Sequence, residues 1–166
     1  MSKVIIYGYS NLGSKIAKSL KNSEFEIIIV DYDEDNYNKA ILDGYNTFNK
    51  DLLEDEELIE IGIESNVKAF YCVSDSSNNN FFVTLSARNL NKKIRIISKA
   101  SSKSDSKKML LAGATKVINP YEIGALRMFR LLDKPIISHV LDKILFGDSL
   151  LNIEEFPILK GSYLDG

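Results

Sequence analysis

The stretch that decides the fold is Val4–Gly13, which reads VIIYGYSNLG. A short apolar run of this kind is typical of a strand that is buried on both faces. The turn that follows has the form G-x-S-x-x-G, one position away from the dinucleotide-binding fingerprint G-x-G-x-x-G. Gly8 would allow the tight turn, and Gly13 would let the next helix pack closely on the strand. These residues predict a strand–turn–helix unit suited to phosphate.

Comparable apolar runs recur along the chain and alternate with helical patterns. Alternation at this spacing is typical of βαβ units with right-handed crossovers. It predicts an α/β fold: a Rossmann-like, doubly wound parallel sheet of about six strands, followed by a helical crossover hairpin. The further strands are expected at Ile27–Val30, Tyr45–Phe48, Ala69–Val73, Ile94–Ile97 and Lys116–Ile118.

Two of the intervening helices are predicted from their apolar patterns. One is expected to place Phe82 and Leu85 on one face, with Val83 and Ala87 beside it. Another is expected over Leu52–Ile61, where a glycine directly follows.

After the sixth strand the pattern changes to two helical segments. The first is expected to begin at Pro120, and the second carries a broad apolar stripe and runs to Phe146. The chain offers no further strand on which this stripe could pack, so a second subunit is expected to cover it. The predicted parts are a Rossmann-like nucleotide-binding subdomain (1–133), a crossover helix for dimerisation (134–149) and the start of a truncated C-terminal subdomain (150–166).

Composition and charge argue against several classes of protein. The 166 residues are 45% hydrophobic and 27% charged, which is ordinary globular usage, and no apolar run approaches the ~20 residues of a membrane span. Cys72 is the only cysteine, so no intrachain disulfide and no zinc site are expected. Residues 31–64 contain twelve acidic residues and only two lysines. Residues 88–134 contain twelve basic residues and three acidic ones. These charge runs are either solvated helix faces or two unlike faces of the molecule, and unlike faces would suit self-assembly or an acidic ligand. The net charge of −2 argues against nucleic acid as a partner.

Asp31 ends the second predicted strand, 23 residues after Gly8. This spacing is close to the ~20 expected of the acid that binds the ribose. A carboxylate there would repel a 2′-phosphate, which favours NAD(H) or a plain adenine nucleotide over NADP(H). Alternatively, Asp31 caps the helix that begins near Asp33, and the two roles are compatible. Ser10 replaces the central glycine, and its hydroxyl could either bond a phosphate or crowd it.

A catalytic set is not evident for this cleft. The single histidine, His139, falls in the expected hairpin, and the sequence has no nucleophile elbow, P-loop or paired carboxylates at the cleft. A dehydrogenase would also need a substrate domain, for which the chain leaves no room. We therefore expect a sensor with no catalytic residues and no metal, and an NAD-dependent oxidoreductase fragment is the alternative.

The sequence resembles the N-terminal subdomain of RCK (regulator of potassium conductance) domains, also called Trk-type NAD-binding domains. The resemblance runs from about Lys3 to Leu145, and the tail Asn152–Phe156 is similar to the opening of the family's C-terminal subdomain. The segments that carry it are Val4–Gly13, Ile29–Asp31, Lys50–Asp51, Leu58–Ile63, Val73–Asn80, Ile97–Ala100 and above all Ala112–Gly124.

The resemblance implies a cytosolic gating domain of a prokaryotic potassium channel or transporter, held at the inner face of the cell membrane by the pore. It implies NAD(H) or an adenine nucleotide (ATP, ADP or AMP) as ligand, with an ion, calcium in some members of the family, as the alternative effector. It also implies homodimers that assemble into octameric rings. Ser10 and Lys50 depart from glycines of the family pattern. The implied site residues are Gly8, Tyr9, Ser10, Asn11, Leu12 and Gly13 at the phosphates, Asp31 at the ribose, Asp51 near the adenine, Ser74 and Asp75 at the cleft mouth, and Lys99 against a phosphate.

Overall fold

The computed structural model describes residues 2–133. The predicted crossover helix with its apolar stripe, His139 and the expected C-terminal subdomain all lie outside the described residues. The chain divides into two compact units, residues 1–122 and 123–166. The sheet and the candidate site belong entirely to the first unit.

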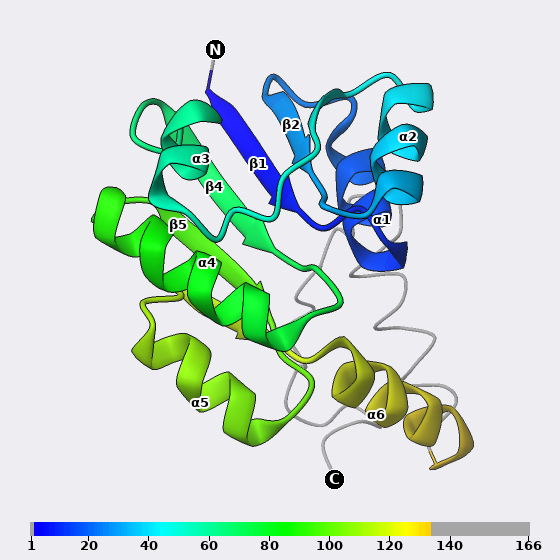
Figure 1. Ribbon diagram of the computed structural model, residues 1–166. Helices are drawn as coiled ribbons and strands as arrows, with labels where there is room; N and C mark the ends of the chain where they lie inside the picture. Colours follow the sequence, from blue (N-terminus) through cyan, green and yellow to red (C-terminus); the bar gives the residue numbers. More distant parts are fainter. Residues whose placement is uncertain (1, 134–166) are drawn as a thin grey trace, which may run out of the picture. The chain divides into compact units, whose positions relative to one another are not determined.

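Strands and helices alternate along the described chain (Figure 1). This order confirms the predicted α/β class. The elements are β1 (Lys3–Tyr7), α1 (Asn11–Leu20), β2 (Glu26–Val30), α2 (Glu34–Leu42), β3 (Asn46–Phe48), α3 (Asp55–Glu60), β4 (Val67–Cys72), α4 (Ser77–Leu90), β5 (Arg95–Lys99), α5 (Lys103–Leu111), β6 (Lys116–Ile118) and α6 (Pro120–Asp133).

The six strands form one parallel sheet in the order β3-β2-β1-β4-β5-β6. In register, Tyr7 of β1 stands beside Val30 of β2 on one side and beside Cys72 of β4 on the other. The carboxyl ends of these three strands therefore lie level with one another. The strand order reverses between β1 and β4, and ligands of doubly wound folds bind in the crevice outside such a reversal.

The aliphatic runs that predicted the strands form the core. Side chains alternate across the sheet, so neighbouring residues of β1 enter different layers. Ile5 and Tyr7 pack with the buried residues of α3 and α4, which lie in front of the sheet in Figure 1. Val4 and Ile6 pack on the opposite face with Ala17 of α1 and with the buried part of α2. The sheet is thus covered on both faces, as the unbroken apolar runs predicted.

The helix predicted over Leu52–Ile61 is shorter than expected. Leu52 has φ +55, in the left-handed region, and its side chain is fully buried. The backbone turns there to bring this side chain into the core. Helix α3 begins only at Asp55 and ends at Glu60.

The face of α4 that carries Phe82 and Leu85 is not the face that is buried. Phe82 is 54% exposed, whereas Val83 and Ala87 are fully buried. The buried face consists of small and polar residues, and Thr84 shares a hydrogen bond of 2.8 Å with Ser98 of β5. Small side chains let the helix approach the sheet closely, which excludes the larger ring from that face.

Helix α6 begins at the predicted Pro120, which has no N–H to satisfy at a first helical position. The side chain of Asn119 accepts hydrogen bonds from the backbone N–H groups of Tyr121 (3.1 Å) and Glu122 (3.2 Å). Several apolar side chains of α6 are exposed, Met128 and Phe129 among them. Over residues 2–133, no helix combines the length and the apolar character that crossing a bilayer requires.

Candidate functional site

Two glycines shape the turn between β1 and α1. Gly8 has φ +100, and a Cβ at this residue would lie 2.5 Å from the backbone N and Cα of Ser74. A Cβ at Gly13 would overlap the carbonyl oxygen of Gly8 and lie 3.5 Å from Cγ2 of Ile6. The first glycine therefore permits the turn against the β4–α4 loop, and the second permits the close packing of α1. These are the structural roles that the sequence predicted.

The N-terminus of α1 has no side-chain cap. Ser10 is the N-cap residue, but its hydroxyl accepts no hydrogen bond from the helix. By contrast, α2, α4 and α5 are each capped by a side-chain oxygen, from Asp33, Ser76 and Ser102 respectively. The first N–H groups of a helix have no intrahelical partner and carry the positive end of its dipole. At α1 these groups are available to an anion.

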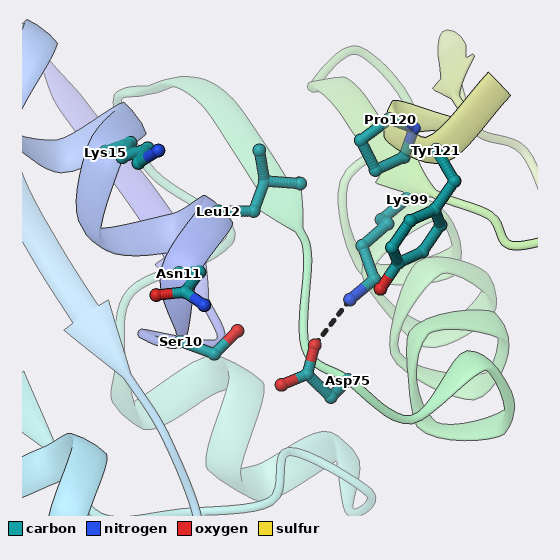
Figure 2. A pocket seen from close by; sticks show the side chains of 8 residues that line it. All are labelled: Ser10, Asn11, Leu12, Lys15, Asp75, Lys99, Pro120 and Tyr121. Atoms are coloured by element: carbon teal, nitrogen blue, oxygen red, sulfur yellow. Dashed lines mark hydrogen bonds and ion pairs between the residues drawn. The ribbon is translucent and has the colours of Figure 1, made fainter. Parts of the chain in front are cut away.

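Two cavities lie at this end of the sheet and share Ser10 and Asp75. The larger, of about 490 Å³, contains the α1 terminus and two lysines (Figure 2). The smaller, of about 110 Å³, contains three carboxylates. The first suits phosphates and the second suits hydroxyl donors such as those of a ribose. The larger is lined by Ser10, Asn11, Leu12, Lys15, Asp75, Lys99, Pro120 and Tyr121, and the smaller by Gly8, Ser10, Asp31, Tyr32, Asp33, Asn36, Ser74 and Asp75.

Asp31 is held firmly at the smaller cavity. Only 3% of the residue is exposed. One carboxylate oxygen accepts a hydrogen bond from the backbone N–H of Tyr9 (2.6 Å), and the other accepts one from that of Asp33 (2.9 Å). Burial raises the pKa of Asp31, whereas these two hydrogen bonds favour its charged form. The alternative role is not observed, because Asp33 rather than Asp31 caps α2 through the N–H of Asn36.

Three of the predicted site residues lie away from the cavity surfaces. Tyr9 contributes its backbone to the turn, but its side chain is fully buried and its hydroxyl donates to Asp43 at 2.6 Å. Gly13 is buried inside α1. Asp51 accepts a hydrogen bond from the N–H of Leu53 at 3.2 Å and lines neither cavity. The predicted residues that the structure does bring together are Gly8, Ser10, Asn11, Leu12, Asp31, Ser74, Asp75 and Lys99.

Lys99 and Asp75 form an ion pair across the larger cavity (Figure 2). Lys99 is only 4% exposed, and its Nζ lies 2.6 Å from Oδ1 of Asp75. The hydrogen bond from Lys99, and to a smaller extent one from Ser10, lower the pKa of the Asp75 carboxyl below its usual value. The cation expected at a phosphate therefore already has a protein partner.

Six lining residues were not predicted as site residues from the sequence: Lys15, Pro120 and Tyr121 of the larger cavity, and Tyr32, Asp33 and Asn36 of the smaller. Lys15 could have been predicted from the sequence, because residues four apart on a helix share a face and Lys15 follows Asn11 by four. Pro120 and Tyr121 come from the chain beyond β6. Because β6 runs parallel to β5, the chain leaves β6 at the same edge of the sheet as the site, which allows Pro120 and Tyr121 to line the larger cavity.

Comparison with known proteins identifies relatives among potassium channels. Residues 4–120 match the family described as TrkA-N domain. Potassium channel protein 1 of Methanocaldococcus jannaschii is 31% identical over 163 residues, which cover 97% of this chain and 48% of that protein. The chain thus spans about half the length of this curated relative.

Solved structures share the fold at lower sequence identity. The GsuK channel bound to NAD superposes with a TM-score of 0.72 at 21% identity, covering 84% of this chain and 25% of that one. The Kef C-terminal domain of Shewanella denitrificans, in its AMP-bound form, superposes with a TM-score of 0.69 at 17% identity, covering 86% and 87%. This likeness confirms the Rossmann-like architecture.

Proposed function

Because the chain belongs to the TrkA-N domain family, we propose that it is a cytosolic regulatory domain of a potassium channel or transporter. It binds a nucleotide at the β1–α1 turn and couples binding to pore opening, at the inner face of the cell membrane. The potassium channel relative and the NAD-bound GsuK channel, whose names describe such proteins, support this assignment. A ligand shifts such an equilibrium only by as much as it binds one state better than the other.

The observation that carries the proposal is the pairing of the two cavities around the α1 terminus. Phosphates bind in the larger cavity, where uncapped N–H groups and Lys15 attract anions. The ribose binds in the smaller cavity, where the buried Asp31 accepts hydrogen bonds from its hydroxyls. Ser10 lines both cavities and stands where the two halves of the ligand join.

The ligand is NAD(H) or an adenine nucleotide, that is ATP, ADP or AMP. The AMP-bound Kef domain, together with the NAD-bound GsuK channel, supports this range. The carboxylates of Asp31 and Asp33 face the smaller cavity and would lie close to a 2′-phosphate. NADP(H) is therefore disfavoured by repulsion between like charges.

The division into parts and the assembly of the protein are proposed to be those expected from the sequence. Residues 1–133 form the nucleotide-binding subdomain, 134–149 a crossover helix that builds a homodimer, and 150–166 the start of a C-terminal subdomain. Exposed apolar side chains on α6 support association, among them Met128 (73% exposed) and Phe129 (62%). Dimers assemble into octameric rings beneath the pore. The output of the domain is binding rather than turnover.

Calorimetry on the wild type and Asp31→Asn tests the binding site, with AMP, ADP, ATP, NADH and NADPH as ligands. Loss of a charged hydrogen bond costs about 1.5–3 kcal/mol, so Asp31→Asn should weaken binding roughly ten- to a hundredfold. Asp35→Asn is the matched control, because it removes the same charge from an exposed residue of α2, close to Asp31 along the chain. Equal affinities in wild type and Asp31→Asn, or no binding by either, would refute the proposed site.

Coupling to a pore requires the full-length channel. Single-channel recording should show an open probability that changes with the nucleotide in the wild type. The Asp31→Asn channel should require a higher nucleotide concentration for the same change. Nucleotide-independent gating in both would refute the regulatory role while leaving the binding site intact.

A further inference from the structure

Lys99 is a buried cation that cannot be left without a partner. Only 5% of its side chain is exposed, and a buried charge is tolerated only when it is paired or hydrogen-bonded. In this structure its partner is Asp75, at 2.6 Å. A phosphate that enters the larger cavity would offer the same Nζ a second acceptor.

The side chain of Asp75 is able to rotate, whereas the backbone that precedes it is held in place. Its side chain is 67% exposed. The preceding residue, Ser74, is fixed by the fully buried Asn80, which accepts from its N–H (3.1 Å) and its hydroxyl (2.8 Å) and donates to its carbonyl (2.9 Å). Rotation of one side chain is therefore enough to separate the pair. The carboxylate nevertheless stays at the junction of the two cavities, because Asp75 lines both.

We propose that Asp75 is a specificity-determining residue, which selects against ligands with highly charged phosphates by holding Lys99 and repelling the incoming anion. This inference rests on the proposed nucleotide site. Repulsion from the Asp75 carboxylate, which stays at the junction of the two cavities, grows with the charge of the phosphate group. The site therefore favours ligands of low phosphate charge, such as a dinucleotide or a nucleoside monophosphate, over a nucleoside triphosphate.

The test compares wild type with Asp75→Asn for AMP, ADP and ATP, which share the adenosine and differ in phosphate charge. Calorimetry should show tighter binding to Asp75→Asn, by about threefold for AMP and about tenfold for ATP, with ADP between. The gain should shrink at high salt because screening weakens both charges. Equal gains for the three nucleotides, or none, would overturn the inference.

Two further variants separate the local charge from other effects. Asp105→Asn is the matched control, because Asp105 also makes an ion pair, with Lys108 at 4.0 Å, and lines neither of the two cavities. It should leave the AMP-to-ATP ratio unchanged. Adding Lys99→Met to Asp75→Asn should abolish most of the gain, and a retained gain would count against the mechanism. Asp75→Gln, which also keeps an acceptor for Lys99 without the charge, should reproduce the ordering if Asp75→Asn folds poorly.

Inorganic tripolyphosphate distinguishes this inference from the proposed function. Nucleotide binding by the wild type with no change in Asp75→Asn overturns the inference alone. If no protein binds any nucleotide, the proposed function fails, and tripolyphosphate then decides the role of Asp75. The inference is supported if Asp75→Asn binds tripolyphosphate while the wild type and the Asp75→Asn/Lys99→Met double variant do not. It is overturned if Asp75→Asn does not bind tripolyphosphate.

Discussion

The substitution Gly13→Ala should displace α1 from the sheet. The added Cβ would overlap the Gly8 carbonyl oxygen, would lie 2.9 Å from the carbonyl carbon and would also approach the side chain of Ile6. The first two neighbours are backbone atoms of the turn itself, so no rotamer change relieves the overlap. The helix can accommodate the methyl group only by moving away from β1.

Overpacking of this kind costs about 1–3 kcal/mol, and backbone neighbours place Gly13→Ala at the upper end, near ~3 kcal/mol. For a chain of this length, that loss lowers the melting temperature by about 6–12 °C. Urea unfolding followed by circular dichroism measures the change in the free energy of unfolding. Nucleotide affinity should fall as well, because the N-terminus of α1 moves with the helix.

Gly44→Ala is the control for this substitution. Gly44 has φ +85, but a Cβ there meets no atom within 4 Å. The control therefore measures backbone strain without a clash, expected at about 1–2 kcal/mol. If Gly13→Ala were no more destabilising than Gly44→Ala, close packing of α1 on the turn would not be what requires a glycine at residue 13.

Three further predictions concern the buried hydroxyl of Tyr9, the thiol of Cys72 and the apolar surface of α6. Tyr9→Phe should reduce the loss of stability on acidification from about pH 5 to about pH 3. The Tyr9 hydrogen bond is the main cause that lowers the pKa of Asp43 below its usual value. Its stabilisation is therefore present above the pKa that Asp43 has in the unfolded chain, and it disappears as the pH falls through the pKa of Asp43 in the folded protein. Identical pH profiles of thermal unfolding for the wild type and Tyr9→Phe would contradict this prediction. Burial raises the pKa of the Cys72 thiol to about 12, so a thiol reagent at neutral pH should label it only as fast as the protein unfolds; rapid labelling of the folded protein would count against the packing of β4. Phe129→Asp should shift the protein toward monomers in light scattering, with the 87% exposed Leu42, changed to Asp, as control; a wild type that is already monomeric at micromolar concentration would remove the basis for a dimer.

The sheet was predictable because its signal is local. Four of the six strands contain apolar runs too short for helices, and each of these strands overlaps the run that predicted it. The strand ends were less predictable. Lys3, Glu26 and Val67 extend their strands beyond the apolar runs, because pairing with a neighbouring strand uses the backbone whatever the side chain.

Features set by long-range contacts were not predictable from local pattern. The exposure of Phe82 follows from how closely α4 approaches β5, and the left-handed turn at Leu52 follows from where its side chain enters the core. The candidate site shows the same division. Spacing along the chain identified the β1–α1 turn and Asp31, but the pairing of Lys99 with Asp75 joins residues from two different strand ends and emerged only from the structure.

We propose that an adenine nucleotide binds with its phosphates at the α1 terminus and its ribose at Asp31. The most direct test is titration of isotope-labelled protein with AMP and with NADH, followed by backbone amide NMR. Both ligands should shift the amide signals of Ser10, Asn11 and Leu12 together with that of Asp31, in a saturable manner. Shifts confined to another surface, such as the separate cavity between α4 and α5 lined by Phe81 and Met109, or no shifts at millimolar ligand, would contradict it.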